Sequence, residues 1–296
     1  MIKRLLCVIA LGVVILITGC IDLTTTISVR KDGSGIITEV VYMDESVEAM
    51  MKGMMQGMMA EMGAEEGEAE ATKDDEDKSL DIEKYKAKAS DLGEGVEFVS
   101  AKQVSGEDGA SGVQVIYSFK DVRKLNVRAN PDNPMGDEMA GMMGAESAEE
   151  DGGDPITFDF IKGGSPKLIV HMPKKDEPET QEKDPPAEIH EEDPEAAAAG
   201  MGMMKQFLGG LRIRVLVDLP DGGIAKTNAS FVETVDGKDT VTLLDVAMGE
   251  IMSNEKYFKE WESMSEIRDM SEAMEKMKDI PGLKIETAET VEIQMK

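Results

Sequence analysis

Apolar and polar residues alternate in several short segments of the chain, and a period of two is typical of β-strands with one buried face. The alternation is clearest at 211–219, where aliphatic residues occupy every second position. It also runs through 22–43, where two such segments flank a Lys-Asp-Gly-Ser-Gly turn and predict a hairpin. Further strand-like segments come in pairs, at 96–104 and 112–122, at 156–161 and 167–172, and at 228–235 and 240–248, before one or two closing strands after 282.

A period of three to four residues, typical of amphipathic helices, marks other parts of the chain. The clearest case is 253–279, where Tyr257, Trp261 and several later methionines recur at this spacing. A shorter helix is predicted for 79–93, ended by Gly93. Paired strands with helices between the groups predict an α+β fold, in which amphipathic helices pack on an antiparallel β-sheet built from hairpins. A parallel α/β fold would instead place a helix after nearly every strand.

Three segments lack apolar periodicity and are rich in acidic residues, near 63–78, 128–154 and 173–200. Segments of this composition cannot bury enough apolar surface to offset the entropy of folding, so we expect them to be disordered insertions. The whole chain has a net charge of −28. Such a charge repels nucleic acid and anionic lipid, so neither is expected as a charge-driven partner.

The first twenty residues have the pattern of a secretion signal. Lys3 and Arg4 precede the apolar segment 5–18, which is too short for an ordinary membrane-spanning helix but suits a signal peptide. The segment ends in Ile-Thr-Gly-Cys20, which resembles the lipobox of bacterial lipoproteins. In that family the chain is cut before the cysteine and its thiol carries diacylglycerol. The alternative is a chance cysteine after an ordinary signal peptide.

The resemblance implies a signal peptide at 1–19 and an extracytoplasmic domain at 20–296, held on the membrane by acyl chains on Cys20. Two or three acyl chains anchor a protein almost permanently. Cys7 would leave with the signal, so no disulfide is expected. By the same resemblance, Ile21 in place of an aspartate permits outer-membrane delivery in a diderm cell.

Residues for catalysis or metal binding are scarce. The chain has two histidines, His171 and His190, and neither lies in a spacing that suits a zinc site. The Asp-Gly pairs lack the alternating carboxylates of a calcium loop, and no phosphate-binding loop or nucleophile elbow occurs. We therefore expect no enzyme activity, no cofactor and no metal site of these kinds.

A methionine-rich segment follows the first predicted hairpin. Its seven methionines are Met50, Met51, Met54, Met55, Met58, Met59 and Met62. On a helix they would cover roughly half of the circumference, with Gly53 and Gly57 beside that face. Three interpretations remain open: methionines packed over the sheet, a contact face for a lipid or protein partner, or a Cu(I) site built from thioether ligands.

Several short features resemble mycobacterial lipoproteins of the LppM type. These are the lipobox, a strand directly after Cys20, the hairpin turn at 31–35 and the Leu-Pro-Asp-Gly sequence at 219–222. The chain departs from that family in its acidic and methionine-rich insertions, and in ending without a membrane helix. The resemblance implies a sheet with packed helices and binding of lipid-like molecules. The expected function is a lipid-anchored, non-catalytic envelope protein with a binding or structural role, and the alternative is a Cu(I)-binding envelope protein.

Overall fold

The computed structural model describes residues 21–45, 80–106, 109–128, 154–173, 209–235, 238–254, 256–259 and 280–296. The predicted signal peptide, Cys20, the methionine-rich segment and most of the helix predicted at 253–279 lie outside these ranges. The three acidic insertions also lie outside them, apart from a few terminal residues. The predictions made for these segments therefore stay predictions.

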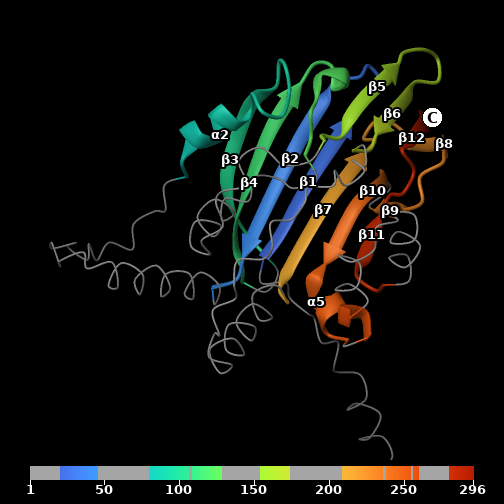
Figure 1. Ribbon diagram of the computed structural model, residues 1–296. Helices are drawn as coiled ribbons and strands as arrows, with labels where there is room; N and C mark the ends of the chain where they lie inside the picture. The colour runs from blue at the N-terminus through green and yellow to red at the C-terminus, as the bar shows by residue number, and fades with distance from the viewer. Residues whose placement is uncertain are drawn as a thin grey trace, which may run out of the picture.

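A large sheet forms most of the described structure (Figure 1). Its strands are β1 (Ile21–Val29), β2 (Gly35–Met43), β3 (Glu97–Ser105), β4 (Ser111–Phe119), β7 (Leu211–Asp218), β9 (Val232–Val235), β10 (Lys238–Ala247) and β11 (Leu283–Ile285). The order is β11-β10-β7-β1-β2-β4-β3, and β9 pairs with β10. The first strand is thus the central one of the seven.

The prediction of a purely antiparallel sheet is wrong at one position, because β1 pairs with β7 in parallel. The predicted hairpins β1–β2 and β9–β10 are antiparallel, as are β3 and β4. Parallel neighbours need a long crossover, and here most of the chain lies between the two strands. Hairpin patterns report pairing between consecutive strands, so this contact between distant segments left no signal in the sequence.

A smaller antiparallel sheet packs over one end of the large sheet (Figure 1). It has the order β5-β6-β12-β8, formed by β5 (Thr157–Ile161), β6 (Lys167–His171), β12 (Thr290–Met295) and β8 (Ile224–Thr227). The β5–β6 pair was predicted as a hairpin, and the closing segment supplies one strand to each sheet. The short strand β8 was not predicted, because its four residues, two exposed and two partly buried, show no clear alternation.

The described helices are short. They are α2 (Ile82–Lys88), η3 (Val122–Lys124) and α5 (Met248–Met252). Residues 256–259, within the helix predicted at 253–279, are helical as well. The predicted helix at 79–93 is therefore confirmed in a shorter form, and Asp81 caps it by accepting a hydrogen bond from the Lys84 amide. The strand predicted to reach residue 122 ends at Phe119 instead. Asp121 caps η3 through the Arg123 amide and so turns the chain out of the sheet.

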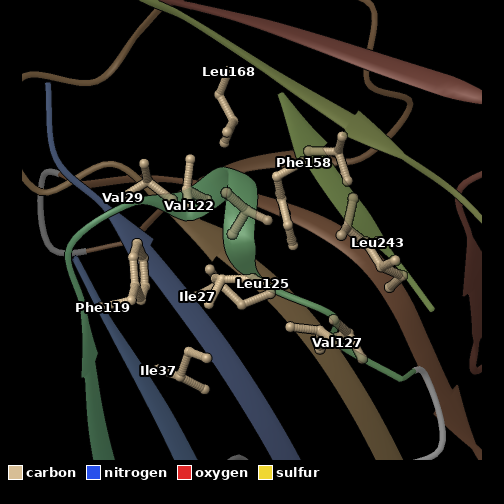
Figure 2. Close-up of a cluster of buried hydrophobic side chains, with 14 of the residues drawn as sticks. Ile27, Val29, Ile37, Phe119, Val122, Leu125, Val127, Phe158, Leu168 and Leu243 are labelled. Atoms are coloured by element: carbon tan, nitrogen blue, oxygen red, sulfur yellow. The ribbon is translucent and has the colours of Figure 1, made fainter. Parts of the chain in front are cut away.

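Alternate residues of β1, β2, β4, β7 and β10 form an inner face, and the part of it toward the Val29 end packs against the small sheet. This main core combines Ile27, Ile37, Tyr117 and Val217 of the large sheet with Phe158, Leu168 and others of the small sheet. Figure 2 shows the turn η3 between the two layers, with Val122 and Leu125 directed into the core. A second, smaller cluster forms where α5 packs against β7 and β11.

The turn between β1 and β2 joins the two sheets. Gly33 has a φ of 88°, and a Cβ atom there would come within 2.9 Å of the Phe160 ring. Its carbonyl accepts a hydrogen bond of 2.9 Å from the Val122 amide. The end of the large sheet at Val29 is therefore covered by the small sheet. The opposite end, at Ile21, is referred to below as the Ile21 end.

Candidate functional site

The predicted site residues, Cys20 and the seven methionines of 50–62, lie outside the described ranges. The structure describes the strand that follows Cys20 and the strand that precedes the methionine-rich segment. β1 begins at Ile21, and β2 ends at Met43 beside it. The site described next is built from other residues, which the sequence analysis did not single out.

Two buried polar residues, Thr25 and Glu39, lie side by side on the inner face of the large sheet. In the strand register, Glu39 of β2 lies between Thr25 of β1 and Val115 of β4. The rows on either side are apolar, with Ile37 and Tyr117 toward the small sheet and Leu23 and Val41 toward the Ile21 end.

Glu39 is only 8% exposed, although it carries a carboxylate. The Lys88 ammonium, from the last turn of α2, lies 3.1 Å from the Glu39 carboxylate. The side chain of Lys88 is 21% exposed and that of Glu39 is 10% exposed, so water screens this ion pair poorly. The pair holds α2 over the inner face at β2.

The hydroxyl of Tyr117 lies in the same region without a hydrogen-bond partner among the described residues. Tyr117 is fully buried, and its ring packs edge-on against Phe98 at a centroid distance of 6.2 Å. Burial raises the pKa of Tyr117 far above its usual range, and the nearby charge of Glu39 and the Tyr85 hydroxyl add to this. Burial also raises the pKa of Tyr85, and the negative charges of Asp81 and Glu39 raise it to a smaller extent. Both phenols are therefore neutral donors at any physiological pH.

A buried donor without an acceptor costs about 1–3 kcal/mol, and nearly all buried polar groups in proteins are paired. The Tyr117 hydroxyl thus marks a place where an acceptor from outside the described chain would be stabilised. Lys88 and Glu39 beside it supply a cation and an anion. Together, these groups can recognise the polar part of a ligand.

Apolar side chains adjoin this polar cluster toward the Ile21 end. One register row runs through Val113, Val41, Leu23, Ile213 and Val246 of five neighbouring strands. All except Leu23 are partly exposed. Leu23 is buried, yet it belongs to neither of the two clusters that the described residues form. This part of the inner face is therefore less completely covered by described elements than the part under the small sheet.

The outer face of the sheet carries a chain of ion pairs near the Ile21 end. Arg214 donates two hydrogen bonds to the Asp22 carboxylate, at 3.0 and 2.8 Å. Arg212 contacts Asp245 in a bidentate manner, at 2.9 and 2.8 Å. These hydrogen bonds raise the pKa of Arg212 above its usual value. The pairs connect β1, β7 and β10, which favours a structural role across the parallel junction.

Another buried carboxylate, Glu286, has a different environment. It is 3% exposed and accepts hydrogen bonds from the Ser230 amide and hydroxyl, at 2.7 and 3.0 Å. The amides of Thr287 and Ala288 also donate to it, at 2.9 and 3.0 Å. Four donors satisfy this group, so it ties the loop before β9 to the chain after β11.

The described residues contain no group of three or more His, Cys, Asp or Glu side chains that could hold a metal ion. His171 contacts Asp159 at 3.0 Å, but both side chains are exposed on the small sheet. Within the same ranges, no helix is long and apolar enough to span a membrane.

One feature of the sequence could have identified the polar cluster. The inward-facing positions of β2 are Ile37, Glu39 and Val41, so a charged residue lies where the alternation predicts an apolar one. Lys88 and Tyr117 left no such signal, because their proximity to Glu39 depends on how α2 and β4 pack.

Comparisons with known proteins identify no family for this chain. No family model matches it, and no curated protein matches it. Among solved structures, it is similar to the NMR structure of the folded domain of LppM from Mycobacterium tuberculosis. The identity is 11% and the TM-score is 0.23, over 76% of this chain and 90% of the LppM domain. A likeness of this size does not establish a shared fold, and the resemblance to LppM-type lipoproteins stays a prediction.

Proposed function

We propose that the protein is a lipid-anchored, non-catalytic lipoprotein of the bacterial cell envelope that binds an amphiphilic ligand on the inner face of its large sheet. The anchor is a diacylglycerol group on Cys20, supported by the lipobox and the preceding signal pattern. The observation that carries the binding role is the buried Tyr117 hydroxyl, which has no hydrogen-bond partner among the described residues and lies beside the Glu39–Lys88 ion pair.

The ligand consists of an apolar part and a hydrogen-bond acceptor. Its apolar part covers the partly exposed row around Val41 and Ile213, because removing apolar surface from water contributes about 25 cal/mol per Å². Its polar part accepts from Tyr117 and lies near Lys88. An uncharged or zwitterionic head group fits this site better than a simple anion, since Glu39 already neutralises Lys88.

The anchor is tested with Cys20→Ala in the full chain, produced in a bacterium. The wild type should fractionate with membranes, and the mass of its N-terminal peptide should include acyl chains. The variant should be unmodified and not held in the membrane by acyl chains. An unmodified Cys20 in the wild type would refute the anchored state.

The binding role is tested with pyrene-labelled phosphatidylcholine as the probe, and Tyr117→Phe compared with Tyr42→Phe. Loss of one hydrogen bond corresponds to roughly 0.5–1.5 kcal/mol, or about a 2- to 12-fold weaker affinity, for Tyr117→Phe. Tyr42 lies on the outer face of the same sheet, so its variant should bind as the wild type does. Equal affinities in all three proteins would exclude Tyr117 from the site.

The methionine face at 50–62 remains a proposed contact surface for the ligand or a partner. Exchange of its seven methionines for leucine keeps the apolar character and removes sulfur, whereas exchange for glutamine removes the apolar character. A contact face should keep its function in the leucine variant and lose it in the glutamine variant. Tight Cu(I) binding that disappears in the leucine variant would favour the metal-binding alternative.

A further inference from the structure

The chain enters the fold at the middle of the large sheet. β1 has three strands on each side in the sheet order, with β2 on one side and β7 on the other. Its first residue, Ile21, is paired with Met43 and with Leu211, and its amide donates to the Gly210 carbonyl at 3.0 Å. No flexible tether separates the sheet from Cys20.

The ends of the neighbouring strands lie at the same level. β2 ends at Met43, β4 begins beside it at Ser111, and β3 ends at Ser105. On the other side β10 reaches Ala247 next to the start of β7, and α5 follows (Figure 1). With about 4.8 Å between strands, this row of ends is roughly 29 Å wide, and Cys20 precedes its central strand.

We infer that the Ile21 end of the large sheet faces the bilayer and lies against its head groups, with the small sheet directed away from the membrane. This inference rests on the proposed acylation of Cys20. One residue spans at most about 3.6 Å, so a glyceryl group on Cys20 must lie next to Ile21. Because the anchor is central, the row of strand ends extends to both sides of it. If the sheet tilts within its own plane, the strand ends on one side come into contact with the head groups.

Two carboxylates near the anchor are paired within the protein, which fits this orientation. The chain has a net charge of −28, and unpaired carboxylates beside an anionic surface would be repelled. Asp22 and Asp245 lie close to the Ile21 end. One guanidinium nitrogen of Arg214 donates to both oxygens of Asp22, and two nitrogens of Arg212 donate to Asp245. The carboxylate nearest to the anchor along the chain is thus paired within the protein.

The orientation also gives the proposed ligand site a short path to the membrane. The apolar row through Leu23 and Ile213 lies two residues beyond the Ile21 end, and the polar pair of Thr25 and Glu39 follows it. The Val29 end, which the small sheet covers, lies about 26 Å from the Ile21 end, because eight residues at about 3.3 Å each separate Ile21 from Val29. An amphiphile therefore reaches the site from the bilayer side.

Two serines provide matched labelling sites for a test. Ser105 ends β3 at the Ile21 end, and Ser165 lies in the β5–β6 turn on the small sheet. Both are exposed. The acylated full chain, with Ser105→Cys or Ser165→Cys coupled to a fluorophore, is reconstituted in phosphatidylcholine vesicles that carry a head-group spin label as quencher.

Quenching at Ser105 should exceed that at Ser165 by roughly threefold or more, because Ser105 lies at the Ile21 end and Ser165 lies on the small sheet, which covers the opposite end of the roughly 26 Å strand β1. A six-residue Gly-Ser insertion between Cys20 and Ile21 should bring the two values together, since it uncouples the sheet from the anchor. Equal quenching without the insertion, or stronger quenching at Ser165, would overturn the orientation while the protein remains bound to vesicles. Failure to float with vesicles, with no acyl mass at Cys20, would instead refute the anchor and the orientation with it.

Discussion

Glu286 and Glu39 are both buried carboxylates, 3% and 8% exposed, but their surroundings differ. Glu286 accepts four hydrogen bonds from two loops. Glu39 faces one cation from α2 and lies near a tyrosine hydroxyl that has no partner in the described structure. The first environment is complete within the protein, whereas the second contains a donor without an acceptor among the described residues.

The difference separates a structural role from a binding role. A buried charge that is fully hydrogen-bonded stabilises one arrangement of the chain and gains nothing from a ligand. A cluster with an unused donor gains free energy when an acceptor arrives. On this argument, Glu286 fastens the loops after β8 and β11, while the cluster around Glu39 is the candidate site.

The largest expected effect is that of Glu286→Ala. It would leave the donors of Ser230, Thr287 and Ala288 without their acceptor in a buried region, at a cost of about 3–5 kcal/mol in the free energy of unfolding. Denaturant unfolding followed by circular dichroism measures the loss. Glu289→Ala, at an exposed position three residues away, should change stability by less than about 0.5 kcal/mol. Similar effects in both variants would remove the structural assignment of Glu286.

Breaking the Glu39–Lys88 pair should have an intermediate effect. Lys88→Met leaves Glu39 without its partner, and we expect a loss of about 1–3 kcal/mol, since Lys88 is partly exposed. Adding Glu39→Gln should recover part of this loss, which a double-mutant cycle measures. The matched control is Lys86→Met in the same helix, because Lys86 pairs with Glu83 on the surface and should contribute less than about 0.5 kcal/mol. A loss for Lys88→Met no larger than the control would show that the pair does not hold α2.

The two glutamates also show what can and cannot be read from the sequence. The strands of the hairpins follow from alternation, and the charged residue at the inward position of β2 identifies Glu39 as unusual. Nothing in the sequence distinguishes Glu286 among the 60 acidic residues, because its donors come from a separate loop. Local patterns report the faces of single strands, whereas the partners of a buried charge depend on tertiary packing.

The same reason explains the wrong prediction for the sheet. The pairs β1–β2 and β3–β4 involve neighbouring segments with a turn between them, so their sequence order predicts antiparallel pairing. The parallel contact of β1 with β7 joins residues about 190 positions apart. The position of β1 at the centre of the sheet, on which the membrane orientation depends, follows from this long-range contact.

Tyr117→Phe should have a smaller and opposite effect on stability. It removes the buried hydroxyl and keeps the ring contact with Phe98, so the ligand-free protein should become more stable by about 1 kcal/mol. The same variant should bind the labelled phospholipid more weakly. Thermal unfolding with and without the lipid measures both changes. Lower stability without lipid would show that the hydroxyl is already paired in the free protein, and the contrast with Glu286 would fail.

The smallest expected effect is the alkaline response of Tyr117. Its pKa is raised in the folded protein, so above pH 10 the unfolded chain loses the phenolic proton while the folded chain keeps it. Well below pH 10 this group does not change the free energy of unfolding, because the folded and unfolded chains both keep the proton. As the pH rises past the pKa of the unfolded tyrosine, about 10, the free energy of unfolding falls, by under about 1 kcal/mol at pH 10.5. Urea unfolding at pH 8 and pH 10.5 measures the decrease, and Tyr117→Phe should reduce it. An equal decrease in both proteins would show that Tyr117 ionises as readily when folded, which is incompatible with a buried donor beside Glu39.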